Sequence, residues 1–181
     1  MSLTTEEMIR AAKEAGFSAA VPLDIHTLHP LDEVRAMCAS NHCHMYEKNW
    51  SCPPGCGSLE FCSEQIRRCT RGILVQTIGD IEDSMDFEGM MEVENRHKEI
   101  FARVTDLFRK EMSVLPLGAG SCVRCKSCTY PDQPCRFPEK MTHSMEAYGL
   151  LVNQVCRDNQ LPYYYGSEKI AYTSCYLVEE L

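Results

Sequence analysis

Hydrophobic residues recur every three or four positions in several stretches of the chain, a spacing typical of amphipathic helices. The longest such stripe predicts a helix from about Met90 to Met112. Shorter helices are predicted at residues 5–15, 31–38, 59–70 and 144–159. The first follows a capping box at Thr4 and stops at Gly16, and the last begins after Ser144, a favourable N-cap residue.

Other segments concentrate β-branched and aromatic residues, which favours strands. Strands are predicted at residues 18–25, 72–78 and 114–117, with one or two more at 163–178. Because strands and helices mix without a regular βαβ repeat, the sequence predicts an α+β fold. We expect a single metal-binding domain over residues 1–181, with a small mixed or antiparallel sheet, packed helices and two cysteine-rich loops (38–69 and 118–138) at one end.

Cysteine content changes this picture, because the chain has 12 cysteines in 181 residues. Six lie between Cys38 and Cys69 and four between Cys122 and Cys135, whereas residues 70–121 contain none. The N-terminal segment is polar and is not a secretory signal, so we expect a cytoplasmic protein. In that compartment cysteines in such numbers indicate metal binding rather than disulfides.

The second cysteine group has the spacing of an iron–sulfur motif, formed by Cys122, Cys125, Cys128 and Cys135. The pattern is close to the bacterial ferredoxin run C-x2-C-x2-C followed by C-P, with a longer last gap and the proline displaced by two. Structural zinc usually takes two well-separated C-x2-C pairs instead. The spacing therefore favours a [4Fe–4S] cluster, with zinc as the alternative.

The first cysteine group matches no simple motif. Its candidate ligands are Cys38, Cys43 and Cys52, with a fourth from Cys56 or Cys62. Trp50 and Pro53 place apolar, donor-poor groups beside Cys52, which would shield a cluster from water. His42 and His44 flank Cys43, so a mixed cysteine–histidine zinc site stays open as an alternative. The chain is thus expected to hold one or two [4Fe–4S] clusters, or zinc.

The remaining cysteines fit small buried hydrophobic residues better than metal ligands. Cys69 and Cys156 lie on the apolar faces of predicted helices, and Cys175 alternates with strand residues. His97, on the apolar stripe of the long helix, is likewise expected in the core or at its boundary.

The formal net charge of −8 argues against nucleic acid or an anionic membrane as the main partner. No apolar run approaches the roughly 20 residues that a membrane span requires. We therefore expect a redox partner protein with a basic surface. Motifs for phosphate loops, dinucleotides and activated nucleophiles are absent from the sequence, so any enzymatic chemistry would reside in the metal centre.

Several motifs, in their order along the chain, resemble one family. They are Cys38-x4-Cys43-His44, Trp50-x-Cys52-Pro53-Pro54, Cys122-x2-Cys125-x2-Cys128, Pro134-Cys135-Arg136-x-Pro138 and Ser144-Met145-Glu146-Ala147-Tyr148-Gly149. This order is similar to that of an uncharacterised family of predicted metal-binding proteins from anaerobic bacteria and archaea. The resemblance covers about residues 30 to 178 and implies a cysteine-ligated metal, expected as iron–sulfur, in an anaerobe's cytoplasm. It also implies that Cys62 is more typical of the first site than Cys56, and it supplies no activity.

Three functions agree with these observations. The first is a small electron-transfer or redox accessory protein with one or two [4Fe–4S] clusters. The second is a structural or regulatory zinc protein, in which the metal contributes folding energy. The third is an iron–sulfur enzyme with one iron open to a small ligand, which a site with only three cysteine ligands would favour.

Overall fold

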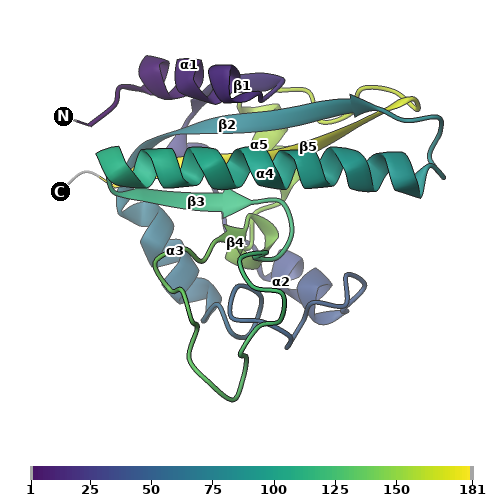
Figure 1. Ribbon diagram of the computed structural model, residues 1–181. Coiled ribbons are helices and arrows are strands. Elements are labelled where there is room, and N and C mark those ends of the chain that lie inside the picture. The colour runs from purple at the N-terminus through teal and green to yellow at the C-terminus, as the bar shows by residue number, and fades with distance from the viewer. Residues whose placement is uncertain (1, 180–181) are drawn as a thin grey trace.

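The computed structural model describes residues 2–179, which form an open five-stranded sheet with helices on both faces (Figure 1). The strands are β1 (Ala19–Leu23), β2 (Cys69–Asp80), β3 (Val114–Gly118), β4 (His143–Ser144) and β5 (Lys169–Glu179). Their order across the sheet is β1-β2-β5-β3-β4. Neighbouring strands are antiparallel except β3 and β4, which are parallel. The predicted α+β class with a small mixed sheet is confirmed.

One face of the sheet is covered by the first and the longest helix. The helices are α1 (Thr5–Ala15), α2 (Asp32–Ala39), α3 (Leu59–Arg67), α4 (Phe87–Glu111) and α5 (Val152–Asp158), with 3-10 turns η1 (Ile25–Thr27) and η2 (Glu146–Tyr148). Met8 of α1 and Phe108 of α4 pack in one core cluster with Ile73 and Tyr176 of the sheet. Burial of each of these side chains contributes roughly 1.5–3 kcal/mol, which explains the apolar stripe of α4.

The opposite face packs against α3, α5 and η2 in a second core that is rich in cysteine. Cys69, Cys156 and Cys175 all lie in this cluster and are at most 5% exposed. The prediction that they are buried small residues is confirmed. His97 is also fully buried, between the hydroxyl groups of two strand residues, as expected for a core histidine.

The helix predicted at 144–159 is wrong in its first half. The Ser144 hydroxyl accepts a hydrogen bond from the Ala147 N–H (2.9 Å), but only the short turn η2 follows, and its N-cap residue is Met145. Gly149 then adopts φ of 75°, and a Cβ there would lie 2.5 Å from the Leu59 side chain. This left-handed glycine interrupts the helix, and α5 begins only after it.

The C-terminal segment also differs from the simplest expectation. Of the one or two strands predicted at 163–178, the structure forms one, β5. The tyrosines at 163–165 precede that strand in an irregular segment.

The two cysteine-rich loops extend together from one end of the sheet, as expected (Figure 1). Trp50 in the first loop donates its indole N–H to the Gln133 carbonyl of the second loop (3.0 Å). Its ring also meets the ring of Tyr130 edge-on, with centroids 4.8 Å apart. Segments 80 or more residues apart in sequence therefore form one lobe below the sheet.

Candidate metal centre

The four cysteines of the second loop border one cavity. Cys122, Cys125, Cys128 and Cys135 are all partly buried, and the cavity has a volume of about 300 Å³. Its apolar walls include Trp50, Val123, Phe137 and Met141. This cavity has many times the volume that one water molecule needs, so it has room for a group larger than a single ion.

Two arginines fix the shape of this loop. Arg124 forms an ion pair with Asp106 of α4, with 2.9 Å between Nη2 and Oδ1. Arg136 donates from Nη1 to the Ser127 carbonyl at 2.7 Å, across the cysteine run. Because both guanidinium groups have protein acceptors, they hold the loop in place as well as adding positive charge near the thiols.

Arg109 of α4 lies beside the same loop with an unsatisfied donor. Its Nη2 donates to the Met141 carbonyl (2.9 Å), whereas its Nη1 is buried and lacks a hydrogen-bond partner among the described residues. Burial is the main cause that lowers the pKa of Arg109, and Cys122 is among the groups that act against it. A buried N–H without an acceptor is costly. The four thiols therefore fit an anionic metal–sulfur group, and the Arg109 cation near Cys122 would offset part of its charge.

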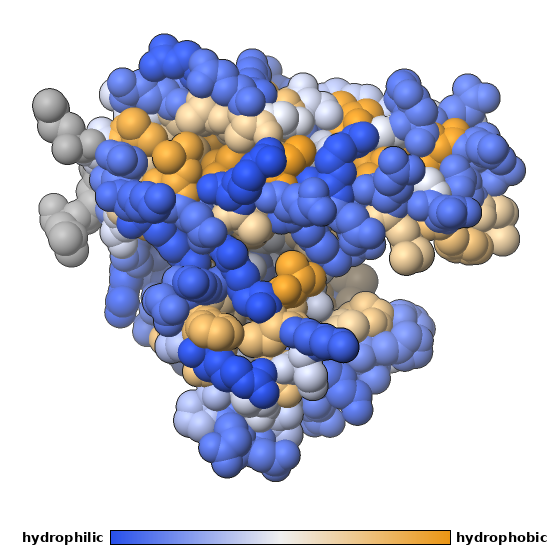
Figure 2. Space-filling view, viewed as in Figure 1, coloured by the Kyte–Doolittle hydropathy of each residue, from blue (hydrophilic) through white to orange (hydrophobic). Residues whose placement is uncertain are grey.

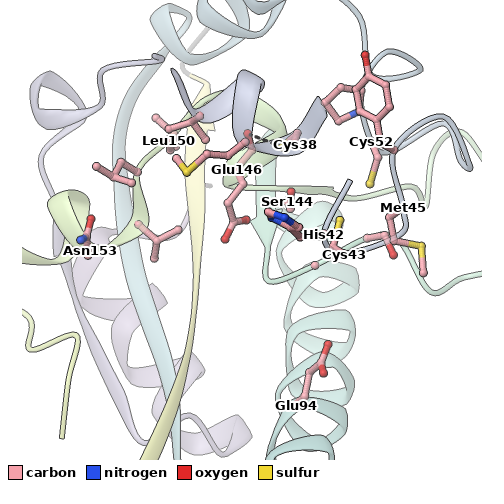
Figure 3. A pocket seen from close by; sticks show the side chains of 18 of the residues that line it. Cys38, His42, Cys43, Met45, Cys52, Glu94, Ser144, Glu146, Leu150 and Asn153 are labelled. Atoms are coloured by element: carbon pink, nitrogen blue, oxygen red, sulfur yellow. Dashed lines mark hydrogen bonds between the residues drawn. The ribbon is translucent and has the colours of Figure 1, made fainter. Parts of the chain in front are cut away.

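Three cysteines of the first group border a second, larger cavity. Cys38 lies in the last turn of α2, Cys43 is exposed on the following loop, and Cys52 is 8% exposed. All three line a cavity of about 600 Å³, and the Glu146 carboxylate points into it (Figure 3). His42 and Glu94 line the same cavity, so three thiols, one imidazole and two carboxylates border it.

Neither candidate for the fourth cysteine is among the residues lining this cavity. Cys62 is fully buried, and Arg35 donates from Nη2 to its Sγ at 3.2 Å. The Cys56 thiol donates to the Ala147 carbonyl (3.8 Å). Hydrogen bonding between the two thiols lowers the pKa of Cys62, an effect that Arg35 reinforces, and raises the pKa of Cys56. The structure therefore separates this pair from the three cysteines of the cavity.

Partial burial favours the protonated forms of the acidic groups in the first cavity. Burial raises the pKa of the Cys38 thiol, and the nearby Glu146 carboxylate acts in the same direction. Burial also raises the pKa of Cys52 and of Glu146 itself. Because metal ligands are thiolates, a metal that binds here must displace protons from Cys38 and Cys52.

The two cavities adjoin one another. Met45 and Ser121 line both of them. Between them, the buried Ser51 hydroxyl accepts a hydrogen bond from the Cys122 N–H (2.9 Å), which joins the loop that carries Cys52 to the second cysteine run. This hydrogen bond therefore ties the two cysteine loops together.

Within residues 2–179, no group of three or more His, Cys, Asp or Glu side chains is placed to hold a metal ion. The cysteines face cavities instead, and His44 does not line the first one. A single zinc ion would therefore require these side chains to move toward each other. The assignment of the nine candidate cysteines as ligands stays a prediction.

Three residues of the site were missed in the sequence. Arg35 and Arg109 belong to helices whose spacing gives no sign of a contact with cysteines. Glu146 lies within the 144–149 motif, but the sequence did not predict that its carboxylate belongs to the site. The 144–149 motif was the one sign of a further role for Glu146, because many other sequences can begin a helix.

The fold and the two thiol-lined cavities define an α+β protein with cysteine-rich candidate metal sites. Residues 21–178 match the model of the family described as predicted metal-binding protein (DUF2284), and the chain belongs to this family. No curated protein and no solved structure matches the chain. Across the part of the chain that the structure describes, no helix is long and apolar enough to cross a membrane.

Proposed function

We propose that this protein binds two iron–sulfur clusters and uses them in a redox reaction. Cys122, Cys125, Cys128 and Cys135 would hold a [4Fe–4S] cluster, because their spacing is of the ferredoxin type. One observation carries the proposal: two separate sets of thiols border two adjoining cavities. A bound cluster supplies one-electron transfer, and adjoining clusters would exchange electrons within the protein.

The first cavity would hold the second cluster through Cys38, Cys43 and Cys52. Because neither Cys56 nor Cys62 lines the first cavity, three thiols remain for this site. A cubane held there by three cysteines would have one iron without a protein ligand. This arrangement supports an iron–sulfur enzyme or accessory factor rather than a simple electron carrier.

A structural or regulatory zinc protein is the second candidate. It is favoured by His42, which lines the first cavity with the three cysteines and would complete a Cys3His set. In that case the metal would contribute folding energy and no electron transfer would occur.

The electron donor or acceptor would be another protein with a basic docking surface. The chain has a net charge of −8, and thiolate-bound clusters would make it more negative. We propose neither nucleic acid nor a membrane as a partner, because both are anionic.

Iron content of single cysteine variants, purified without oxygen, tests the assignment. Cys125→Ser and Cys43→Ser should each lose about half of the iron, since each removes a ligand of one cluster. Cys56→Ser should keep the full iron content, and so should Cys62→Ser. Loss of half the iron in Cys62→Ser, with unchanged circular dichroism, would show that Cys62 is a fourth ligand and would overturn the open-iron proposal.

A further inference from the structure

The cavity lined by Cys38, Cys43 and Cys52 continues into a neighbouring cavity of about 700 Å³. Glu94, Gly120, Glu146, Val152 and Tyr163 line both of them. The two cavities therefore form one cleft between the α4 and sheet layer and the lobe that carries the loops. Figure 2 shows the surface hollowed between these two parts of the molecule.

The far part of the cleft has aromatic walls. Tyr163, Tyr164, Tyr165 and Tyr172 all line it. Tyr165 donates its hydroxyl hydrogen to Gln76 Oε1 (2.6 Å), and Tyr172 donates to the Met90 carbonyl (3.2 Å). These two rings are therefore fixed by their hydroxyl ends.

Tyr163 lies where the two cavities meet. Its side chain is 51% exposed and makes no hydrogen bond or ring contact with another described residue. Burial is the larger cause that raises the pKa of Tyr163, and the Glu146 carboxylate is the next. The ring and the carboxylate also border the same part of the cleft, because both residues line both cavities.

The lysines of the cleft are paired, whereas one of its acidic groups is not. Lys98 pairs with Glu94, and Lys169 pairs with Asp80, so both ammonium groups have carboxylate partners. Glu146 has no basic partner among residues 2–179, and its side chain is instead hydrogen-bonded to Ser144. The cleft thus presents one uncompensated carboxylate beside an open aromatic ring.

We infer that this cleft binds a small organic cation, whose ammonium group lies against the Glu146 carboxylate and the ring of Tyr163. A carboxylate pairs with an ammonium ion by charge, and an aromatic face attracts it through the ring quadrupole. The apolar body of the ligand would pack toward Val152 and the other tyrosines. Binding requires no metal. That the bound cation is a substrate at the open iron rests on the proposed function.

Anions fit this cleft less well. Both lysines that line it are already paired, and the thiolates of a loaded first site would add negative charge at one end. A neutral ligand would bury the Glu146 carboxylate without a counter-ion, which is unfavourable.

Calorimetric titration with three compounds of similar size tests the inference: benzyltrimethylammonium, benzyl alcohol and benzoate. Protein purified without oxygen should bind the cation at least about tenfold more tightly than the alcohol, and benzoate least. Glu146→Gln should reduce the difference between cation and alcohol to about twofold or less. Glu64→Gln, an exposed carboxylate on α3, should leave it unchanged.

Two tyrosine variants separate the ring from the hydroxyl. Tyr163→Phe keeps the aromatic face and should retain the cation affinity, whereas Tyr163→Leu should weaken it about tenfold. Equal affinity of the wild-type protein for cation and alcohol would overturn the inference without any variant. Unchanged selectivity in a folded Glu146→Gln protein would overturn it as well.

Iron measured in the same samples distinguishes this inference from the proposed function. Selective cation binding in protein that holds no iron would support the cleft and contradict the clusters. Full iron content without cation selectivity would contradict the cleft alone.

Discussion

At the scale of single residues, Arg109 connects the core helix α4 with the second cysteine loop. Its Nη1 is buried without a partner in the described chain, and Cys122 is close enough to affect its pKa. A cation beside a cluster stabilises the more negative reduced form and so raises the reduction potential.

Replacing Arg109 by methionine should therefore lower the reduction potential of the Cys122 cluster by roughly tens of millivolts. A redox titration followed by electron paramagnetic resonance measures it. Arg67→Met, at the exposed end of α3, serves as the matched control and should leave the potential unchanged. Equal potentials in the two variants would show that Arg109 does not act on the cluster.

His97 is a residue-scale determinant of stability that is separate from the metal sites. Its Nδ1 lies 2.8 Å from the Thr77 hydroxyl and its Nε2 lies 2.6 Å from the Ser174 hydroxyl. Burial lowers the pKa of His97 to about 3, and the charge of Lys98 adds to the effect. The neutral ring is therefore the form that the fold contains.

The free energy of unfolding should consequently fall in mild acid. An unfolded histidine has a pKa of about 6.5, so the unfolded chain takes up this proton first as the pH decreases. The contribution of His97 is complete above that pH and is lost toward pH 3, by up to about 1.4 kcal/mol per pH unit. Urea unfolding of His97→Gln should show a shallower pH slope than wild type or His29→Gln, at matched metal content. Parallel slopes would contradict this role.

At the scale of elements, the two cysteine loops depend on each other through Ser51. This side chain is 1% exposed, accepts from the Cys122 N–H (2.9 Å) and donates to Asn49 Oδ1 (2.6 Å). A loop without regular secondary structure has few backbone partners of its own, so this hydrogen bond helps to fix the start of the cysteine run.

Replacing Ser51 by alanine should loosen the second loop, because the Cys122 N–H loses its acceptor at a cost of about 1–3 kcal/mol. Iron should then pass to a chelator at least about fivefold faster than in wild type. Ser127→Ala lies on the same exposed loop and should release iron at the wild-type rate. If both variants behave alike, the contact between the loops is unimportant for retention of metal.

Elements with strong local signals could be predicted from the sequence. The capping box at Thr4, the left-handed Gly16 and the stripe of α4 each follow from local chemistry. The helix at 144–159 was predicted wrongly in its first half, where Gly149 is left-handed and closely approaches Leu59, a residue 90 positions earlier. Tertiary contacts of this kind leave no periodic trace in the sequence.

The candidate site shows the same division. Spacing alone groups the Cys122 run, since its cysteines lie in one short loop. That neither Cys56 nor Cys62 lines the first cavity could not be foreseen, because Arg35 and the η2 turn contact them only in the folded chain. The position of Glu146 in the lining of the first cavity could not be predicted either, because it also depends on the fold.

At the scale of the whole molecule, the sheet core and the metal lobe are separate sources of stability. The two hydrophobic clusters join α1, α4, α3 and α5 to β2 and β5, whereas the loops at 40–58 and 119–142 are fixed mainly by hydrogen bonds and by their cysteines. Metal should therefore order the lobe more than it stabilises the sheet.

Removal of the metal by a chelator under reducing conditions should leave the sheet folded. Hydrogen exchange should find the amides of β2 and β5 still protected, while those of the two loops exchange at least about tenfold faster than in the loaded protein. Cooperative loss of protection in both regions would mean that the metal supports the entire fold, as in a structural zinc protein.

The central claim is that the two cysteine sets hold iron–sulfur clusters. Metal and acid-labile sulfide analysis of protein purified without oxygen, with an absorption spectrum, tests it most directly. We predict about eight irons and eight sulfides per chain and a broad band near about 400 nm. About one or two zinc ions per chain, without sulfide or colour, would contradict the account.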